Sequence, residues 1–287
     1  MIETRPLDSL AEMVQAVDLQ REIWGYGEQG NSFPYPARAL FALARSGGLV
    51  AGAFSGSDMV GLGVAWIGLP PNVPRRPYLH SQLVGVLKSH RRLRIAMRLK
   101  LLQRDFALEC DLDLVRWTFD PLRATNARLN LARLGAVSTS YEINYYGRIR
   151  SSLGSGLDSD RLWAEWYVRS PRVANRLDSE ARLKACGELP FACINPLSRS
   201  AEGSPRVLEL QTDRQEESLL FEIPPDFQSL QTKDPRLAVE WQQKTRNGLR
   251  NYLARSYLLS DFIRVEDGGR CFYVLTRKPV EQVLKET

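Results

Sequence analysis

The stretch from Leu79 to Glu109 constrains the fold of this chain more than any other. It opens with largely apolar residues up to Leu87, passes through a short polar turn, and continues as a long apolar helix from about Leu93. A strand that leads into a helix places the unpaired N–H groups of the first helical turn at the end of the strand, where they attract an anion. The stretch therefore predicts an anion site at the start of the helix.

The charge around this turn has a single sign. Between residues 75 and 104 the chain has no Asp or Glu and nine basic residues, which are Arg75, Arg76, Lys88, Arg91, Arg92, Arg94, Arg98, Lys100 and Arg104. The net charge of the whole 287-residue chain is only +6, so the basic residues are concentrated here. A local positive field favours an anion site. A solvated helix face is the alternative, although such faces usually mix both signs.

Hydrophobic periodicity predicts a regular order of elements around this stretch. A capped helix over 8–24 is followed by a Gly- and Pro-rich loop over 25–38 and a hairpin. After the helix that ends at Glu109 comes a strand, and Asp120-Pro121 begins a helix that ends at Gly135, a typical C-terminal cap. The predicted strands are 48–54, 59–69, 79–87, 113–119, 136–146 and 161–168.

The remainder of the chain predicts a second, smaller α+β unit. Strands are expected at 207–210, 219–223, 262–265 and 271–276, with a helix from about Pro235 to Tyr257. A helix followed by two antiparallel strands thus occurs twice, at 121–168 and at 235–276. The predicted domains are 1–170 and 171–287, and the second is a candidate partial repeat of the first.

Composition narrows the class of protein. Hydrophobic residues make up 44% of the chain and no apolar run approaches twenty residues, which predicts a globular protein without a membrane span. The N-terminus has no apolar signal core, so we expect a cytoplasmic protein. The four cysteines, Cys110, Cys186, Cys193 and Cys271, show no C-x-x-C spacing and are expected as reduced thiols without a metal.

The order of elements resembles the GNAT superfamily of acyl-CoA-dependent N-acyltransferases. The run from Val84 to Ala96 is similar to the acyl-CoA signature of that family, in which a strand is followed by Arg or Gln, two residues, Gly, one residue, and Gly or Ala. Arg91 matches the first position and Ala96 the last. Asn126 to Gly135 resembles the end of the family's next helix, and the whole run looks like a bacterial branch. The resemblance covers about 1–170.

The resemblance implies an α/β (α+β) fold with a mixed, splayed central sheet flanked by helices. It also implies acetyl-CoA or another acyl-CoA as co-substrate, with no metal. The backbone of Val84 and Val86 would bind the pantetheine arm, and a cleft would lie between strands 79–87 and 113–119. The pyrophosphate would be held by the turn and its surroundings, for which the implied residues are Arg91, Arg92, Arg94, Ala96 and Asn126.

Two residues depart from the family pattern. Arg94 stands where the signature has Gly, which tolerates positive φ, and a non-Gly residue there costs on the order of 1–2 kcal/mol. Its side chain either reaches a phosphate or blocks the cleft. Leu131 stands where many members have a Tyr as general acid. Tyr141, Tyr145 and Tyr146 are candidate substitutes, and Tyr146 is the one we select.

A general base is needed because an ammonium must lose a proton before its nitrogen attacks a thioester. In some GNAT members a base precedes the signature Arg or Gln by eleven residues, and the same count from Arg91 gives His80. The intrinsic pKa of histidine suits that role. The alternative is a strand-end histidine that bonds to backbone. Asp120 is favoured as a helix cap over a base.

Three functions compete at this point. The first is transfer of an acyl group, expected to be acetyl, to a primary amine. A small-molecule amine is the expected acceptor, and the sequence does not separate an amino acid, an aminoglycoside, a polyamine or a protein N-terminus. The second is a binding or regulatory protein that kept the fold and lost catalysis. The third, nucleic-acid binding through the basic run, is disfavoured because no aromatic residues interleave with the charges. The oligomeric state is left open as well.

Overall fold

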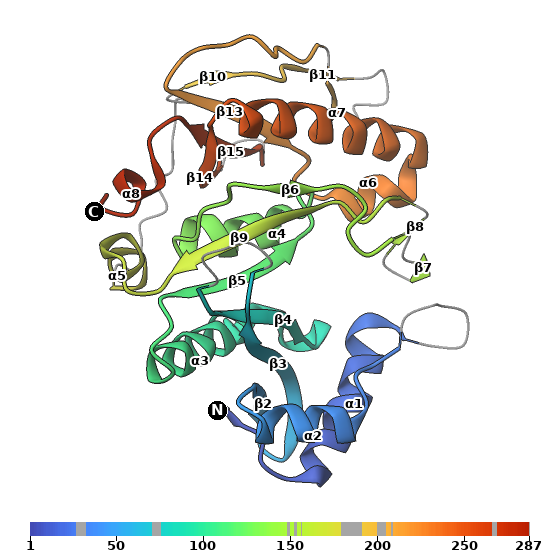
Figure 1. The fold of residues 1–287 in the computed structure, drawn as a ribbon. Coiled ribbons are helices and arrows are strands. Elements are labelled where there is room, and N and C mark those ends of the chain that lie inside the picture. Colours follow the sequence, from blue (N-terminus) through green and yellow to red (C-terminus); the bar gives the residue numbers. More distant parts are fainter. Residues whose placement is uncertain are drawn as a thin grey trace. The chain divides into compact units, whose positions relative to one another are not determined.

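The computed structural model describes the chain in two compact units (Figure 1). The first contains Met1–Trp117 and Ile149–Ser155, and the second contains Thr118–Arg148 and Gly156–Thr287. The described residues are 1–26, 33–70, 76–147, 150–151, 154–155, 157–178, 191–199, 205–207, 209–265 and 269–286. Arg75 and Cys186 lie outside them.

A five-stranded sheet forms the centre of the first unit. Its order is β1-β2-β3-β4-β5, and neighbouring strands are antiparallel except β4 and β5, which are parallel. The strands are β1 (Ile2–Pro6), β2 (Leu49–Ser55), β3 (Asp58–Gly68), β4 (Tyr78–Val86) and β5 (Leu114–Phe119). The predicted mixed sheet and the predicted neighbourhood of the strands at 79–87 and 113–119 are confirmed.

Helices cover both faces of this sheet. α1 (Leu10–Trp24) begins with a capping box at Ser9, and Ile23 and Trp24 at its end lie against Gly85. α3 (Ile95–Glu109) covers the opposite face, where Gly61 would bring a Cβ within 2.9 Å of Ile95. Because successive residues of a strand face opposite sides, these contacts fix which helix lies on which face. α2 (Ala37–Arg45) packs with α1 on an apolar core around Met13, Leu40 and Leu62.

Sequence periodicity missed parts of this unit. β1 was not predicted, because alternate residues of its five-residue sequence do not form an apolar face. α2 was not predicted either, and its first two residues lie in the segment predicted as a loop; it has no side-chain cap and follows Pro36. A 3₁₀ helix, η1 (Lys88–Leu93), occupies the predicted polar turn, so α3 begins at Ile95 rather than near Leu93. β7 (Arg150–Ser151) and β8 (Gly154–Ser155) form a short hairpin.

The second unit begins with the last two residues of β5. The predicted helix up to Gly135 is a four-residue α4 (Ala124–Ala127) that continues as a π-helix, η2 (Arg128–Arg133). β6 (Tyr141–Glu142) and β9 (Arg161–Tyr167) are antiparallel, and the sheet order at this point is β5-β9-β6. The predicted strand over 136–146 is therefore shorter than expected, with isolated bridges at Val137 and Ser138 before β6.

A second sheet completes this unit. Its order is β10-β13-β15-β14, formed by β10 (Ala192–Cys193), β13 (Ser218–Ile223), β15 (Cys271–Thr276) and β14 (Leu258–Arg264). Helices α6 (Phe227–Lys233) and α7 (Pro235–Ala254) connect β13 to β14. The other described elements are α5 (Pro171–Asp178), β11 (Leu197–Arg199), β12 (Pro205–Val207) and α8 (Val280–Val283). Of the strand predicted over 207–210, only Val207 is in a strand, as the last residue of β12; residues 209–210 are not, and residue 208 lies outside the described residues. The strand predicted at 262–265 begins earlier, at Leu258.

The two sheets of the second unit are joined where two helices end. Gly135 and Ser256 each follow a helix with positive φ, 74° and 63°. Ser138 and Leu259 lie three residues after them and exchange both backbone hydrogen bonds, at 3.0 and 2.9 Å. Each sheet contains a strand–helix–strand–strand series, with strands β5, β6 and β9 in one and β13, β14 and β15 in the other. In both, the last strand of the series lies between the first two. The predicted echo between 121–168 and 235–276 therefore corresponds to the same local topology, while the boundary near residue 170 stays a prediction.

None of the helices in the described ranges is long and apolar enough to cross a membrane. The described cysteines, Cys110, Cys193 and Cys271, are free thiols. The part of the chain that the structure describes contains no group of three or more His, Cys, Asp or Glu side chains arranged to hold a metal ion.

Candidate functional site

The parallel strands β4 and β5 separate after two residue pairs. Leu79 pairs with Val115 and His80 with Arg116, and no further pair between these fully described strands follows. From Ser81 to Val86 the edge of β4 is therefore not bonded to β5. This divergence is the splay predicted for the middle of the sheet.

The backbone groups along this edge have a defined direction. Antiparallel pairs alternate between residues that bond to the partner strand and residues that point away. The N–H of Leu87 donates to the carbonyl of Val60 on the β3 side at 3.0 Å. By that alternation the N–H and C=O groups of Val84 and Val86 point to the other edge, toward β5. A bulge at Gln82, between the pairs Val64–Leu83 and Ala65–Ser81, marks the start of the divergence.

The turn that follows β4 adopts the conformation for which the signature uses Gly. Arg94 has φ 56° and ψ 21° and is the N-cap residue of α3. The N–H of Arg98 makes the first helical bond, to Arg94 O at 3.2 Å, so the amides of Ile95, Ala96 and Met97 precede the hydrogen-bond ladder. The sequence keeps a left-handed residue at this position despite a cost of about 1–2 kcal/mol for a non-Gly side chain.

The basic run divides into two groups. Arg91, Arg92 and Arg94 are exposed around the turn, and Arg91 Nε donates to the carbonyl of Val86 at 3.3 Å, at the open edge of β4. Arg98 and Lys100 bond within the protein instead, Arg98 to Ile2 O at 2.7 Å and Lys100 to Ser81 Oγ at 2.8 Å. The exposed positive charges of this turn are therefore Lys88 and the three arginines, rather than the whole run.

His80 lies at the point where the two strands separate. Its ring is 9% exposed and packs on Trp66 and Tyr78, with ring centroids 5.2 and 6.2 Å away. Nε2 lies 2.9 Å from Oε1 of Gln82. Because an amide oxygen only accepts, Nε2 carries the proton and Nδ1 the lone pair. Burial lowers the pKa of His80, and the charges of Lys100 and Arg116 lower it further, against the hydrogen bond to Gln82.

Lys100 was counted from the sequence among the nine basic residues of the anion-attracting run, but the structure buries its side chain. Its side chain is 3% exposed, and Nζ lies 3.3 Å from the ring centroid of Trp117 as well as 2.8 Å from Ser81 Oγ. It thus contacts both β4 and β5 at the point of divergence. Burial lowers the pKa of Lys100 well below its usual value. Its helical spacing from Gln103 and Ala107, which are also buried, is the signal that could have identified it.

The remaining predicted residues belong to the second unit. Tyr146 is 45% exposed, and its hydroxyl lies 3.1 Å from Oγ1 of Thr118. Its backbone N–H donates to Ser159 Oγ at 2.7 Å. Asn126 is exposed on α4. Leu131 is fully buried in η2, which accounts for it as a packing residue.

Tyr141 is less suited than Tyr146 to donate a proton. Its hydroxyl donates to Asp160 Oδ2 at 2.6 Å, and burial together with that carboxylate raises the pKa of Tyr141 strongly. Asp160 also accepts from Arg246 at 2.8 Å. Asp120 accepts from the N–H of Leu122 at 2.9 Å, in the turn before α4. The prediction that it caps this helix was wrong, because the N-cap residue of α4 is Arg123, whose side chain makes no capping hydrogen bond.

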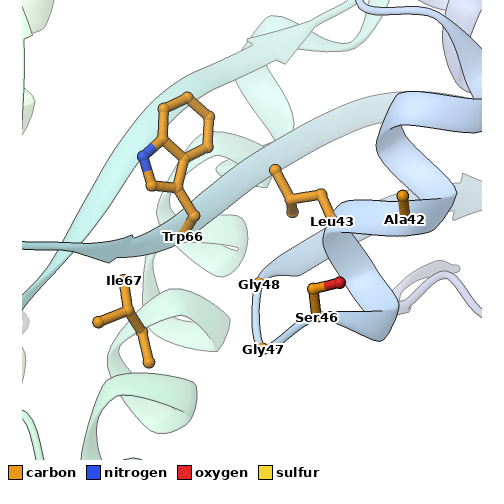
Figure 2. A pocket seen from close by; sticks show the side chains of 7 residues that line it. All are labelled: Ala42, Leu43, Ser46, Gly47, Gly48, Trp66 and Ile67. Atoms are coloured by element: carbon orange, nitrogen blue, oxygen red, sulfur yellow. The ribbon is translucent and has the colours of Figure 1, made fainter.

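A hollow of about 380 Å³ opens on the first unit between the end of α2 and β3 (Figure 2). Trp66 and Ile67 line one side of it, and the turn from Ser46 to Gly48 lines another. The ring of Trp66 also packs on His80. No charged side chain lines the hollow among the residues described, so we do not assign the phosphates of a cofactor to it.

Comparison with known proteins gave matches in structure but none in sequence. No family model matches the chain. No curated protein matches it either. Among solved structures, the chain is similar to NAA60 of Arabidopsis thaliana in complex with a bisubstrate analogue, with 14% identity, a TM-score of 0.47, and coverage of 58% of this chain and 98% of that one.

Two bacterial structures match over the same share of this chain. The ribosomal-protein-S18-alanine N-acetyltransferase of Escherichia coli shows 12% identity and a TM-score of 0.44, with 58% of this chain and 94% of that chain covered. The acetyltransferase yncA of Salmonella typhimurium, solved with acetyl-CoA, shows 15% identity and a TM-score of 0.45, with the same coverages. Identities this low concern the fold alone.

The chain has a GNAT-like fold. Strand order, the parallel pair, the bulge and the left-handed residue before α3 carry this conclusion. Within the GNAT-like site, the structure brings Val84, Val86, Arg91, Arg92, Arg94 and Ala96 together around one open strand edge and one helix start. It leaves Asn126 and Tyr146 in the second unit, where their roles stay predictions.

Proposed function

We propose that the protein transfers an acyl group from an acyl-CoA to a primary amine. The observation that carries the proposal is the open edge of β4, which leads from the divergence at Ser81 to the left-handed turn at Arg94. Such an edge offers backbone hydrogen bonds to an extended ligand that contains amides. The turn offers three helical N–H groups and three arginines to phosphates.

In the proposed complex, the diphosphate of the co-substrate binds at residues 91–96. The pantetheine arm extends along Val84 and Val86, and the thioester lies toward the start of β4. The imidazole of His80 takes a proton from the ammonium of the acceptor, which the lowered pKa of His80 favours because the imidazole is neutral at physiological pH. The amine lone pair then forms the C–N bond at the thioester carbon.

Breakage of the C–S bond releases CoA as a thiolate. The thiolate takes up a proton to become a thiol, and Tyr146 is the residue we propose as its source. The products are an amide and free CoA, with no redox step and no metal.

Titration of the full chain with CoA and with acetyl-CoA tests the proposal. We expect saturable heat and a higher melting temperature, and an affinity that falls as salt is raised because the phosphates face arginines. Release of free thiol in the presence of a panel of primary amines then reports transfer. No heat and no thermal shift at millimolar CoA would exclude an acyl-CoA site.

A second candidate is a GNAT-fold protein that binds CoA without catalysis. Two observations favour it: Leu131 is fully buried in place of the family's acid, and the ring of His80 is only 9% exposed. CoA binding without thiol release across the amine panel, unchanged in His80→Gln, would support this alternative over the enzyme.

A further inference from the structure

One side chain of α3 contacts both β4 and β5 where the two strands separate. Lys100 extends from α3 and contacts Ser81 on β4 through Nζ, at 2.8 Å, and the Trp117 ring on β5, at 3.3 Å from Nζ to the centroid. Ser81 is the first residue of β4 beyond the last pair with β5. The Lys100 side chain therefore bridges the two strands at the point where they stop pairing.

This lysine has no anionic partner within the described residues. Its only hydrogen bond is to a hydroxyl, and no carboxylate lies within ion-pair distance of it there. Burial alone lowers its pKa well below the usual value. Burial disfavours the charged form of this amine, so an apolar group can lie against it at a lower cost than against a fully charged ammonium.

The position of Ser81 along β4 determines which part of a bound acyl-CoA would contact Lys100. A ligand held by phosphates at residues 91–96 and extended along the open edge passes Val86 and then Val84. Ser81 lies five residues before Val86, roughly 17 Å away at the rise of an extended strand. The reacting end of an acyl-CoA, rather than its nucleotide, is directed to this point.

We propose that Lys100 forms the floor of the acyl pocket and restricts the transferred group to a short acyl chain such as acetyl. This inference rests on the proposed acyl-CoA function and adds the chain-length class of the donor. A longer chain would have to displace the lysine from both Ser81 and Trp117. Ser81, 3% exposed, and the Trp117 ring leave little room for such a movement.

Affinity for a series of acyl-CoAs tests the proposal without knowledge of the amine. Calorimetry with acetyl-, butyryl- and hexanoyl-CoA, with CoA as reference, would be run on the wild type, Lys100→Ala and Lys100→Met. In the wild type we expect hexanoyl-CoA, which has four more methylenes, to bind at least about 10-fold more weakly than acetyl-CoA, since even one extra methylene is worth about that much in a closed pocket. In Lys100→Ala the order should reverse, because the longer chain fills the space.

Lys100→Met is the matched control, since it keeps the length of the side chain and removes the amine. It should retain the wild-type order. If Lys100→Ala fails to fold, Lys100→Leu shortens the side chain less and should admit butyryl-CoA but not hexanoyl-CoA. A folded, CoA-binding Ala or Leu variant with the wild-type order would overturn the proposal. No CoA binding by the wild type would instead overturn the acyl-CoA function itself, and this inference with it.

Discussion

The described strands of each unit include a parallel pair, and the two pairs differ in what lies along the edge where pairing stops. β4 and β5 share two residue pairs in the first unit, and β10 and β13 share two in the second, Ala192–Leu219 and Cys193–Leu220. In both units the strands then stop pairing. In the first unit the free edge of β4 leads to a basic turn and a helix start, whereas β10 leads to β11 with no helix between them.

The second opening is filled by a side chain. Asn195, fully buried two residues after β10, donates from Nδ2 to Glu222 O at 2.8 Å and accepts from Glu222 N–H at 2.7 Å. Its carboxamide thus makes the two bonds that another strand would make with β13. Glu222 is held in turn by Arg270, through contacts of 2.8 and 2.5 Å. We infer that a divergent parallel pair binds a ligand only where no side chain of the protein itself bonds to the free backbone N–H and C=O groups at its edge.

The largest expected effect on stability comes from replacing Asn195, whose side chain fills the second opening. Asn195→Leu has a similar size but leaves the N–H and C=O of Glu222 without partners in a buried position. Each unsatisfied group costs about 1–3 kcal/mol, so for the two groups we expect a loss of unfolding free energy of roughly 2–6 kcal/mol. Urea denaturation measures it, and Thr232→Ala on the exposed side of α6 is the control.

That substitution also tests the comparison. Because Asn195 lies in the second unit, the affinity of the folded variant for CoA should match the wild type under native conditions. A variant of unchanged stability would show that the carboxamide does not close the second opening. A variant that gains a second CoA site would show that the two pairs are functionally equivalent.

A smaller effect is expected at the open pair. Arg91→Ala removes a guanidinium at the turn, and loss of a hydrogen bond to a charged phosphate should weaken CoA binding by about 1–3 kcal/mol. The salt dependence of the affinity should decrease as well. Arg98→Ala is the matched control within the same basic run, because Arg98 bonds to Ile2 O and should affect stability rather than affinity. Equal losses of affinity in both variants would indicate a diffuse field instead of a site.

Sequence patterns predicted the parts of the molecule that are periodic. The buried strands β4, β5, β13 and β15 and the helices α1, α3 and α7 were recovered because their apolar residues repeat within the element. β10 has two residues and α2 lacks a side-chain cap, so neither gives a local signal. The left-handed residue at Arg94 was predicted from the resemblance to the GNAT signature.

The roles of Lys100 and Asn195 could not be predicted in the same way. Each depends on a partner far along the chain, Ser81 or Glu222, and a sequence alone does not say which polar residue meets which strand edge. A lysine within a basic run and an asparagine within a loop both have ordinary solvent-exposed alternatives. Only the arrangement of the strands distinguishes them.

Replacement by an apolar residue should have opposite effects on the free energy of unfolding at Lys100 and at Asn195. The pKa of Lys100 is lowered in the folded state, so between that value and the unfolded pKa of about 10.4 the unfolded chain binds the extra proton, and stability rises with pH. Below this window the burial of Lys100 reduces stability by about 1.4 kcal/mol for each unit of lowering. Lys100→Met removes this cost and about 1 kcal/mol of hydrogen bonding to Ser81.

We therefore expect Lys100→Met to be equal to or slightly more stable than the wild type at neutral pH. The rise of stability with pH that Lys100 contributes should be absent. Denaturation midpoints from pH 6 to 10 measure both. A loss as large as that of Asn195→Leu would mean that Lys100 is charged and paired in the folded protein.

The smallest net effect is expected at Arg94, because two contributions oppose each other there. Arg94→Gly relieves the left-handed strain, about 1–2 kcal/mol, and should raise the melting temperature of the ligand-free protein.

For CoA binding, the sign of the change in affinity depends on what the Arg94 side chain does. If Arg94 blocks the cleft, Gly raises the affinity; if it contacts a phosphate, Gly removes a charge-assisted hydrogen bond and lowers it. We expect lower affinity, because the side chain is exposed beside Arg91 and Arg92 and makes no hydrogen bond within the described protein. A chain that retains a strained arginine at the start of a helix, among two other arginines, has the arrangement of a phosphate ligand. Calorimetry on Arg94→Gly decides this, with Arg94→Asn as a control that keeps a residue tolerant of positive φ without the charge. Tighter binding by both variants would show that the open pair, like the β10–β13 pair, is closed by its own chain.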